Sequence, residues 1–290
     1  MGGSIPGSDL AEGAAGLARP ATAAARAQRW KVLRRAARAR LAPFGAAVIA
    51  LAVLLALAAP LVAPYDPLAQ TLGKTLSPPG REHLLGTDNV GRDVLSRVIW
   101  GTRVSLLAGL VSVALAVLAG SLLGVLAGYC GGRVDGVVMR VMDAVLSFPP
   151  LVLALALGAV LGAGLAGVLL ALGVVYTPTF ARLMRGQVLS ITARDYVDAA
   201  RALGASGWRV AARHVVPNAI NPIIVQASLS VAFAILAEAS LSFLGLGIQP
   251  PQASWGSMIN AGRGYLQQAP WIVFGPGAAL KPPVTSGLAR

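Results

Sequence analysis

The chain has 290 residues, of which 56% are hydrophobic and only 12% are charged. An ordinary soluble domain carries roughly 25% charged residues, so this composition argues against a soluble globular protein. The net charge is +13, but the basic residues gather beside apolar runs, at 1–41 and 182–213. That distribution follows the positive-inside rule of membrane proteins rather than the pattern of a nucleic-acid-binding surface.

Five apolar runs are long enough to cross a membrane as helices, which takes about 20 apolar residues. We predict these spans at 44–62, 104–129, 137–160, 168–184 and 220–246. Pro43 suits the start of the first helix and Pro60 marks its end. Residues 1–41 form a basic tail without an apolar core, so we expect no cleaved signal peptide and a place at the cytoplasmic membrane surface.

The segment between the first two runs, residues 65–102, is polar and nearly balanced in charge. We therefore expect it outside the cytoplasm. With the first span it makes up a predicted N-terminal part, residues 42–103. Residues 91–101 are typical of a short amphipathic helix that lies near the membrane interface.

The second run carries Gly120, Gly124 and Gly128, which lie four residues apart and therefore on one helix face. Small residues at this spacing allow two helix backbones to approach closely. The alternative is that glycine is simply frequent in membrane helices.

Prolines interrupt the next two runs. Pro149 and Pro150 should kink or break the third helix, and Pro178 should kink the fourth. Residues 185–217 are the one substantial polar segment inside the predicted permease core, 104–280, and their excess of arginine places them in the cytoplasm. Four predicted crossings separate this segment from the basic tail, and an even number puts both on the same side.

The last apolar run, 271–280, has ten residues and is interrupted by Gly-Pro-Gly. It is half as long as a complete span requires. Residues 281–290 begin with Lys-Pro-Pro and form an atypical C-terminal tail. The sequence therefore predicts five clear spans and a short or incomplete sixth.

Three charged residues fall inside the predicted spans, where burial makes them candidates for function. Arg140 and Asp143 lie three residues apart on one helix and could pair with each other. Glu238 either faces a transport pathway or a partner helix, or is satisfied by a neighbouring hydroxyl or backbone group. The sequence leaves both interpretations open.

The most informative segment is residues 196–218, which read YVDAARALGASGWRVAARHVVPN. Asp198, Ala199 and Ala200 start a short helix, and Gly204 allows a turn. Residues 208–214 make a second helix, and Pro217 ends it before the fifth span. The alternatives are a compact knob that transmits force from a moving partner and an ordinary solvated helical hairpin.

The spacing of this segment resembles the EAA loop of binding-protein-dependent ABC importers. Asp-Ala-Ala is followed after three residues by Gly204, and after nine more by His214, with Pro217 three residues later. Asp198 stands where the general pattern has Glu, while His214 and Val216 stand where it has Ile and Leu. In that family the loop docks in a cleft of the ATPase subunit. The resemblance therefore implies coupling roles for Asp198, Ala199, Ala200, Gly204, His214 and Pro217.

Three more segments resemble the permeases of dipeptide, oligopeptide and nickel importers. They read HLLGTDNVGRDVLSRVIWGTRVSL from His83, GYCGGRVDGVVMRVMDAVLSFPPLVLAL from Gly128 and LAEASLSFLGLGIQPPQASWGSMI from Leu236. The resemblance implies an all-α, polytopic transmembrane bundle with the type I importer permease fold in the inner membrane. It also implies a complete sixth span, from which this chain departs.

The same resemblance implies the partners of the chain. They are a homologous permease, two ABC ATPase subunits, an external substrate-binding protein and membrane lipid, with no nucleic acid. Peptides or similar small solutes would pass between the two permeases, and a nickel complex is an alternative substrate.

No catalytic, cofactor or metal site is expected in this chain. The sequence has no G-x-x-x-x-G-K-[ST] phosphate loop, so ATP and magnesium are expected on the partner ATPases. The histidines at 83 and 214 fall on opposite sides of the membrane, and Cys130 is the single cysteine.

Two other classes of function fit the sequence less well. A secondary transporter or channel predicts inverted repeats or charged relays within the spans, and the sequence has no clear repeat. A membrane scaffold or receptor subunit leaves the spacing of the EAA-like segment unexplained.

Overall fold

The computed structural model describes residues 42–280, of which residues 42–52 and residues 53–280 belong to two separate units. Within the described residues the regular elements are helices, with one isolated β-bridge between Thr87 and Asp93. The predicted all-α class is therefore confirmed. The predicted tails, 1–41 and 281–290, lie outside the described residues.

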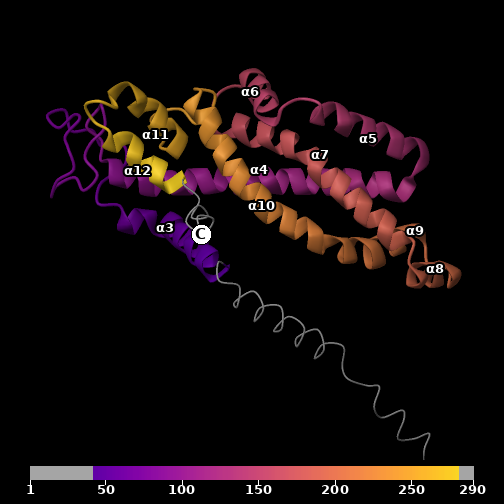
Figure 1. Cartoon of the computed structure of the whole chain (residues 1–290). Helices are drawn as coiled ribbons and strands as arrows, with labels where there is room; N and C mark the ends of the chain where they lie inside the picture. The colour runs from indigo at the N-terminus through magenta and orange to yellow at the C-terminus, as the bar shows by residue number, and fades with distance from the viewer. Residues whose placement is uncertain (1–41, 281–290) are drawn as a thin grey trace, which may run out of the picture. The chain divides into compact units, whose positions relative to one another are not determined.

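Three helices within residues 42–280 are long and apolar enough to cross a membrane (Figure 1). They are α4 (Val94–Cys130), α7 (Leu165–Thr192) and the continuous helix Gly207–Phe243, which comprises α9 (Gly207–Val210), the π-helix η1 (Ala211–Val215) and α10 (Val216–Phe243). A fourth span arises only if α5 (Gly132–Leu146) and α6 (Pro150–Leu161), which are bent by 93°, are taken together. The predicted count of five clear spans is therefore not confirmed.

The first and last predicted spans coincide with shorter apolar helices. Helix α3 (Ala42–Val62) contains the apolar stretch Ala50–Val62, and α12 (Trp271–Leu280) has ten residues. The remaining helices are short: α8 (Asp195–Ala202), α11 (Trp255–Gly262) and the 3₁₀-helix η2 (Arg263–Tyr265).

Two predicted boundaries were wrong. Residues 91–101 do not form a separate interfacial helix, because Asp93 caps α4 by accepting a hydrogen bond from the Ser96 amide at 2.7 Å, and the helix continues to Cys130. The predicted polar loop 185–217 begins later, since α7 continues to Thr192. The last turns of α7 are polar but remain helical. A fall in hydropathy predicts where a helix leaves the membrane and does not predict where the helix ends.

Pro217 was also expected to end a helix, and it does not. The amide of Val216 donates to the carbonyl of Ala211, which is the wide i→i+5 bond of a π-helix. Pro217 itself has no N–H to donate and lies in the first turn of α10. The wide turn therefore lets α9 pass into α10 without a break.

The main core lies between α4, α7 and α10. Its buried residues are Val113, Ala116, Phe180, Met184, Val188, Ile191, Val197, Val210, Val215, Ala219, Ile223 and Ala234. Apolar residues from α8, α9 and η1 thus belong to the same cluster as residues of the three long helices. The short helices are therefore packed into the bundle rather than held beside it by their connections alone.

Three of the glycines of α4, at positions 120, 124 and 128, lie where α4 meets α7. A Cβ atom at Gly120 would lie 2.5 Å from the carbonyl oxygen of Thr177, and one at Gly124 would lie 2.5 Å from that of Ala181. At Gly128 it would lie 2.9 Å from the Cβ of Val188. Real Cβ atoms do not approach so closely, so these positions bring the two backbones together.

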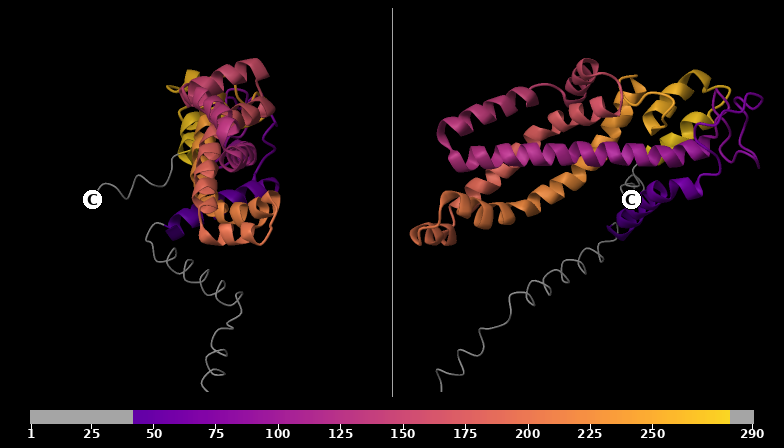
Figure 2. Two further views of the ribbon diagram at one scale, coloured as in Figure 1. Left: turned by 90° about the vertical axis from the view of Figure 1, so that its right-hand side faces the viewer. Right: turned by 180° about the vertical axis from the view of Figure 1, so that it is seen from behind.

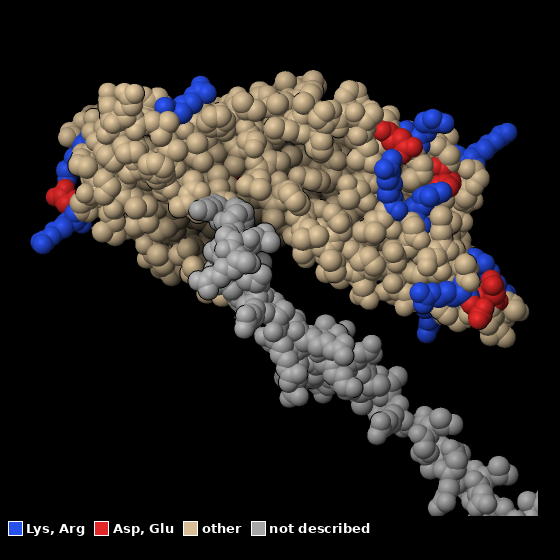
Figure 3. Space-filling view, in the orientation of Figure 1, with Lys and Arg blue, Asp and Glu red and all other residues tan. Residues whose placement is uncertain are grey.

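On the face that Figure 3 shows, most of the charged side chains of the Val53–Leu280 unit gather towards its two ends. At one end, α5 and α7 are joined by ion pairs between Asp135 and Arg185 and between Asp143 and Arg182. The predicted pair of Arg140 with Asp143 is therefore wrong. Asp143 instead pairs with Arg182 of α7, across the interface between the two helices.

Replacing Gly124 with alanine should destabilise the bundle, because the new methyl group meets the backbone of α7. We expect a loss of about 1–3 kcal/mol, typical of overpacking, seen as a lower melting temperature of the detergent-solubilised protein. Gly136→Ala is the matched control on α5, since nothing lies within 4 Å of its Cβ position. Equal melting temperatures for the two variants would contradict close packing at Gly124.

Candidate coupling site

Helices α8 and α9 and the π-helix η1 make up a compact knob, residues 195–215. The knob lies at one end of the bundle, and the segment 63–93, which we call the cap, lies at the other end with α11 and α12 (Figures 1 and 2). The knob connects directly to two long helices, α7 before it and α10 after it.

Gly204 shapes the turn between the two helices of the knob. Its amide donates to the carbonyl of Arg201 at 2.9 Å, and the amide of Ala205 donates to that of Ala200 at 3.1 Å. These two bonds form a Schellman motif, which requires a left-handed residue after the helix. Gly204 has φ +81° and supplies it.

The knob is fixed to the bundle by fully buried valines. Val197 of α8, Val210 of α9 and Val215 of η1 are buried in the main core. A Cβ atom at Gly207 would lie 3.3 Å from the hydroxyl of Tyr129, at the end of α4. The knob therefore contacts α4 as well as the helices that precede and follow it.

The outward side of the knob carries large apolar side chains. Leu203 is 89% exposed and Trp208 is 82% exposed. Neither residue is among the coupling residues predicted from the sequence. Trp208 could have been identified, because it is a tryptophan in a polar segment between two spans. Both side chains therefore present apolar area that the described part of the chain leaves uncovered.

The residues expected in the coupling loop are all in or beside this knob. Asp198 is exposed and pairs with Arg201 at 3.3 Å, Ala199 is exposed and Ala200 is half-buried. His214 is half-buried in η1, and its carbonyl accepts from the side chain of Asn218 at 2.7 Å. Pro217 is exposed in the first turn of α10.

Glu238 lies far from the knob, near the other end of α10. Its side chain has no solvent exposure, and it accepts hydrogen bonds from Ser105 of α4 at 3.0 Å and from Ser242 at 2.8 Å. In this conformation it faces α4 and not an open pathway. Within residues 42–280 no three His, Cys, Asp or Glu side chains gather as metal ligands would.

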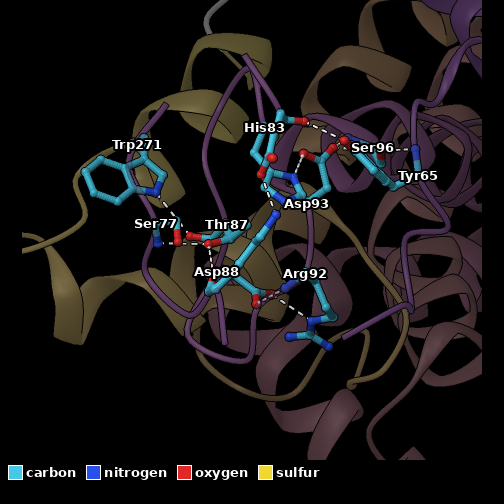
Figure 4. Close-up of polar contacts among 11 residues, drawn as sticks. Tyr65, Ser77, His83, Thr87, Asp88, Arg92, Asp93, Ser96 and Trp271 are labelled. Carbon is cyan, nitrogen blue, oxygen red and sulfur yellow. Dashed lines mark hydrogen bonds and ion pairs between the residues drawn. The ribbon is translucent and has the colours of Figure 1, made fainter. Parts of the chain in front are cut away.

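A network of buried charges holds the cap against the start of α4 (Figure 4). Asp88 accepts from the side chain of Arg92 at 2.7 Å, and Arg97 lies 3.7 Å from the same carboxylate. The ring of His83 contacts Asp93 at 2.9 Å. Because Asp88, Arg92 and Arg97 are nearly inaccessible to water, removing Asp88 would leave two buried arginines without this carboxylate.

The cap also contacts the C-terminal part of the described chain. The indole N–H of Trp271 donates to the carbonyl of Thr87 at 3.1 Å, so α12 begins against the cap (Figure 4). Arg97 donates to the carbonyls of Pro67 at 3.0 Å and Pro251 at 3.3 Å. These contacts join residues far apart in sequence, and no local sequence pattern indicates them.

Comparison with known families gives two matches. Residues 120–280 match the family of binding-protein-dependent transport system inner membrane components. Residues 28–79 match the N-terminal TM domain of oligopeptide transport permease C. The first match includes α7, the whole knob and α10.

Curated proteins are similar over most of their length. The probable D,D-dipeptide transport system permease protein DdpC of Escherichia coli (strain K12) is 47% identical over 235 residues, covering 81% of this chain and 79% of that protein. The di/tripeptide transport system permease protein DppC of Pseudomonas aeruginosa (strain UCBPP-PA14) is 46% identical over 236 residues, covering 79% and 78%.

A solved structure supports the fold. A chain of the MetNI methionine ABC transporter in inward-facing conformations aligns with a TM-score of 0.54 and 18% identity, covering 63% of this chain and 88% of that one. Together with the match over residues 120–280 and the relatives above 45% identity, the evidence assigns the family. The chain belongs to the inner membrane components of binding-protein-dependent transport systems, the permease subunits of ABC importers.

Proposed function

We propose that this permease forms part of the translocation pathway for di- or oligopeptides and is driven by ATP hydrolysis on separate subunits. The knob carries the proposal, because it exposes Leu203 and Trp208 while its valines are buried in the bundle. One side of the knob is thus free to bind another protein, while the other side is fixed to the membrane helices. The apolar surface binds the ATPase, and the buried side transmits its movement.

The mechanism is alternating access. ATP binding closes two partner ATPases and displaces the knob, and α7 and α10 move with it because they share its core. The peptide passes between this chain and a homologous permease, while lipid covers the apolar surfaces that remain. ATP and magnesium bind to the partner subunits.

The knob end is assigned to the cytoplasm and the cap to the opposite side, where an external binding protein delivers the substrate. The charge distribution supports this orientation, since arginine is in excess in and beside the knob. These arginines are Arg194, Arg201, Arg209 and Arg213, against the acidic residues Asp195 and Asp198. The same orientation puts the N-terminal tail in the cytoplasm.

Peptides are the proposed substrates because relatives above 45% identity are named for dipeptides and tripeptides. The direct experiment reconstitutes the complex in liposomes with its binding protein and measures uptake of a labelled dipeptide. We expect uptake that needs both ATP and the binding protein, and that unlabelled dipeptides compete for. Uptake of a nickel complex without competition by peptides would overturn this substrate class.

Replacing Leu203 with aspartate should separate the permease from its ATPase. Burying a leucine is worth about 1.5–3 kcal/mol, so the ATPase recovered with the tagged permease should fall about tenfold or more. Leu72→Asp is the matched control in the cap, because Leu72 is 88% exposed and Leu203 is 89% exposed. Undiminished recovery with Leu203→Asp would contradict docking at the knob.

The effect of a substitution at Gly204 should depend on whether the new residue tolerates a left-handed backbone, and not on its size alone. Nothing lies within 4 Å of its Cβ position, but φ is +81°. Valine there should cost about 1–2 kcal/mol of local stability and uncouple ATP hydrolysis from uptake, whereas asparagine tolerates this conformation. If valine and asparagine gave the same ratio of uptake to hydrolysis, the turn would not be required for coupling.

Cys130 provides a test of the orientation, because it is exposed at the end of α4 nearest α5. A membrane-impermeant maleimide added to intact cells should leave it unmodified and should label it in inverted vesicles. In a Cys130→Ser background, Leu72→Cys should show the opposite pattern. Labelling of Cys130 in intact cells would reverse the assigned orientation.

A further inference from the structure

Glu238 is a buried acidic residue that the mechanism above does not use. Each of its carboxyl oxygens accepts one hydrogen bond from a hydroxyl group. The donors are Ser105 of α4, at 3.0 Å, and Ser242, at 2.8 Å. Ser105 lies 133 residues away in sequence, so this bond joins two of the long helices near the cap end of α10.

The serine on α10 extends the bonding to the turn that follows. The hydroxyl oxygen of Ser242 accepts from the amide of Ile248 at 3.0 Å, which leaves its proton for Glu238. The turn is pressed against this serine, because a Cβ atom at Gly247 would lie 2.0 Å from its oxygen. One carboxyl group therefore links α4, α10 and the turn 244–254.

Helix α11 completes the same block. A Cβ atom at Gly256 would lie 2.3 Å from the carbonyl oxygen of Ala239, beside Glu238. The indole of Trp255 donates to the carbonyl of Val98 on α4 at 3.1 Å. The turn 244–254 is thus held at both ends against the same two helices.

A permanent link would not need an acid, since apolar residues fill such sites without the cost of burying a charge. The hydrogen-bond partners of Glu238 within the described residues are hydroxyls rather than a cation. When the Ser105 bond breaks, the serine can instead donate to a carbonyl of its own helix. No counter-charge is left unpaired, and the carboxyl group keeps its bond to Ser242, so opening this link breaks one hydrogen bond and no ion pair.

We propose that Glu238 is a positioning residue of the transport cycle: it holds α4 and the turn 244–254 against α10 in this conformation, and releases α4 when the outer face opens. This inference rests on the proposed function, since the movement originates at the knob. Helix α10 joins the two places, because it starts directly after the knob and carries Glu238 near its other end.

The test uses Ala253→Cys in a Cys130→Ser background, in the full complex. Ala253 is 6% exposed, so an impermeant maleimide added outside reports opening of the turn. Ser105→Ala removes only the bond to α4 and should raise the labelling rate about fivefold, the factor expected for one lost hydrogen bond. Glu238→Gln should also raise it.

Ser240→Ala is the control on the same helix, because its hydroxyl is exposed and bonds only the carbonyl of Leu236 at 2.9 Å. It should label like the parent protein. Trapping the ATP-bound state with vanadate should raise labelling of the parent and add little in Ser105→Ala, where the link is already open.

Two results would overturn the proposal. One is labelling of Ser105→Ala at the rate of Ser240→Ala. The other is an equal increase on trapping in Ser105→Ala and the parent, which would make the bond a static contact. Ser105→Ala decides the matter if Glu238→Gln fails to fold. The labelling experiment uses no peptide substrate. Its outcome therefore tests the role of Glu238 even if the proposed substrate class is wrong.

Discussion

The close contact between α4 and α7 is the interaction on which the rest of the structure depends. Three glycines remove the side chains that would separate the two backbones. Phe180, Met184 and Val188 of α7 can then pack in a core that also takes in the valines of the knob. Without that approach the knob would lose the core that it shares with α4 and α7, and the helix that continues into α10 would be its main attachment.

The two ends of the bundle differ in their buried polar contacts. The knob is held by apolar burial, which is non-directional and tolerates small shifts. The cap end has an apolar cluster of its own around Val94, Met258 and Ile272, and adds buried ion pairs and hydrogen bonds, which lose strength when their geometry changes. A displacement that begins at the knob therefore meets a defined set of polar contacts at the other end, and in the Glu238 link the donors are hydroxyls rather than cations.

Sequence patterns predicted much of the helical scaffold and few of its polar contacts. Long apolar runs locate α7 and α10, and Pro149-Pro150 locates the 93° bend between α5 and α6. The glycine spacing on α4 singled out the residues that meet α7. These features are predictable because each depends on residues a few positions apart.

The remaining features depend on residues far apart in sequence. The contact between Trp271 and Thr87 spans 184 residues, and the choice of Arg182 rather than Arg140 as partner of Asp143 depends on how α5 packs. Proline rules also failed at Pro217, where a π-helical turn preserves the helix. The number of complete spans remains a prediction, because α12 is short and α5 and α6 are bent.

Rigid attachment of the knob to α4 and α7 is the central claim, and a distance measurement tests it most directly. Spin labels at Ala202→Cys and Leu118→Cys, in a Cys130→Ser background, report the separation of the knob from α4. The same distance distribution is expected in the nucleotide-free complex and in the complex trapped with ATP and vanadate. A second distribution that appears only on trapping would mean that the knob swings on its connections, and would contradict transmission through a shared core.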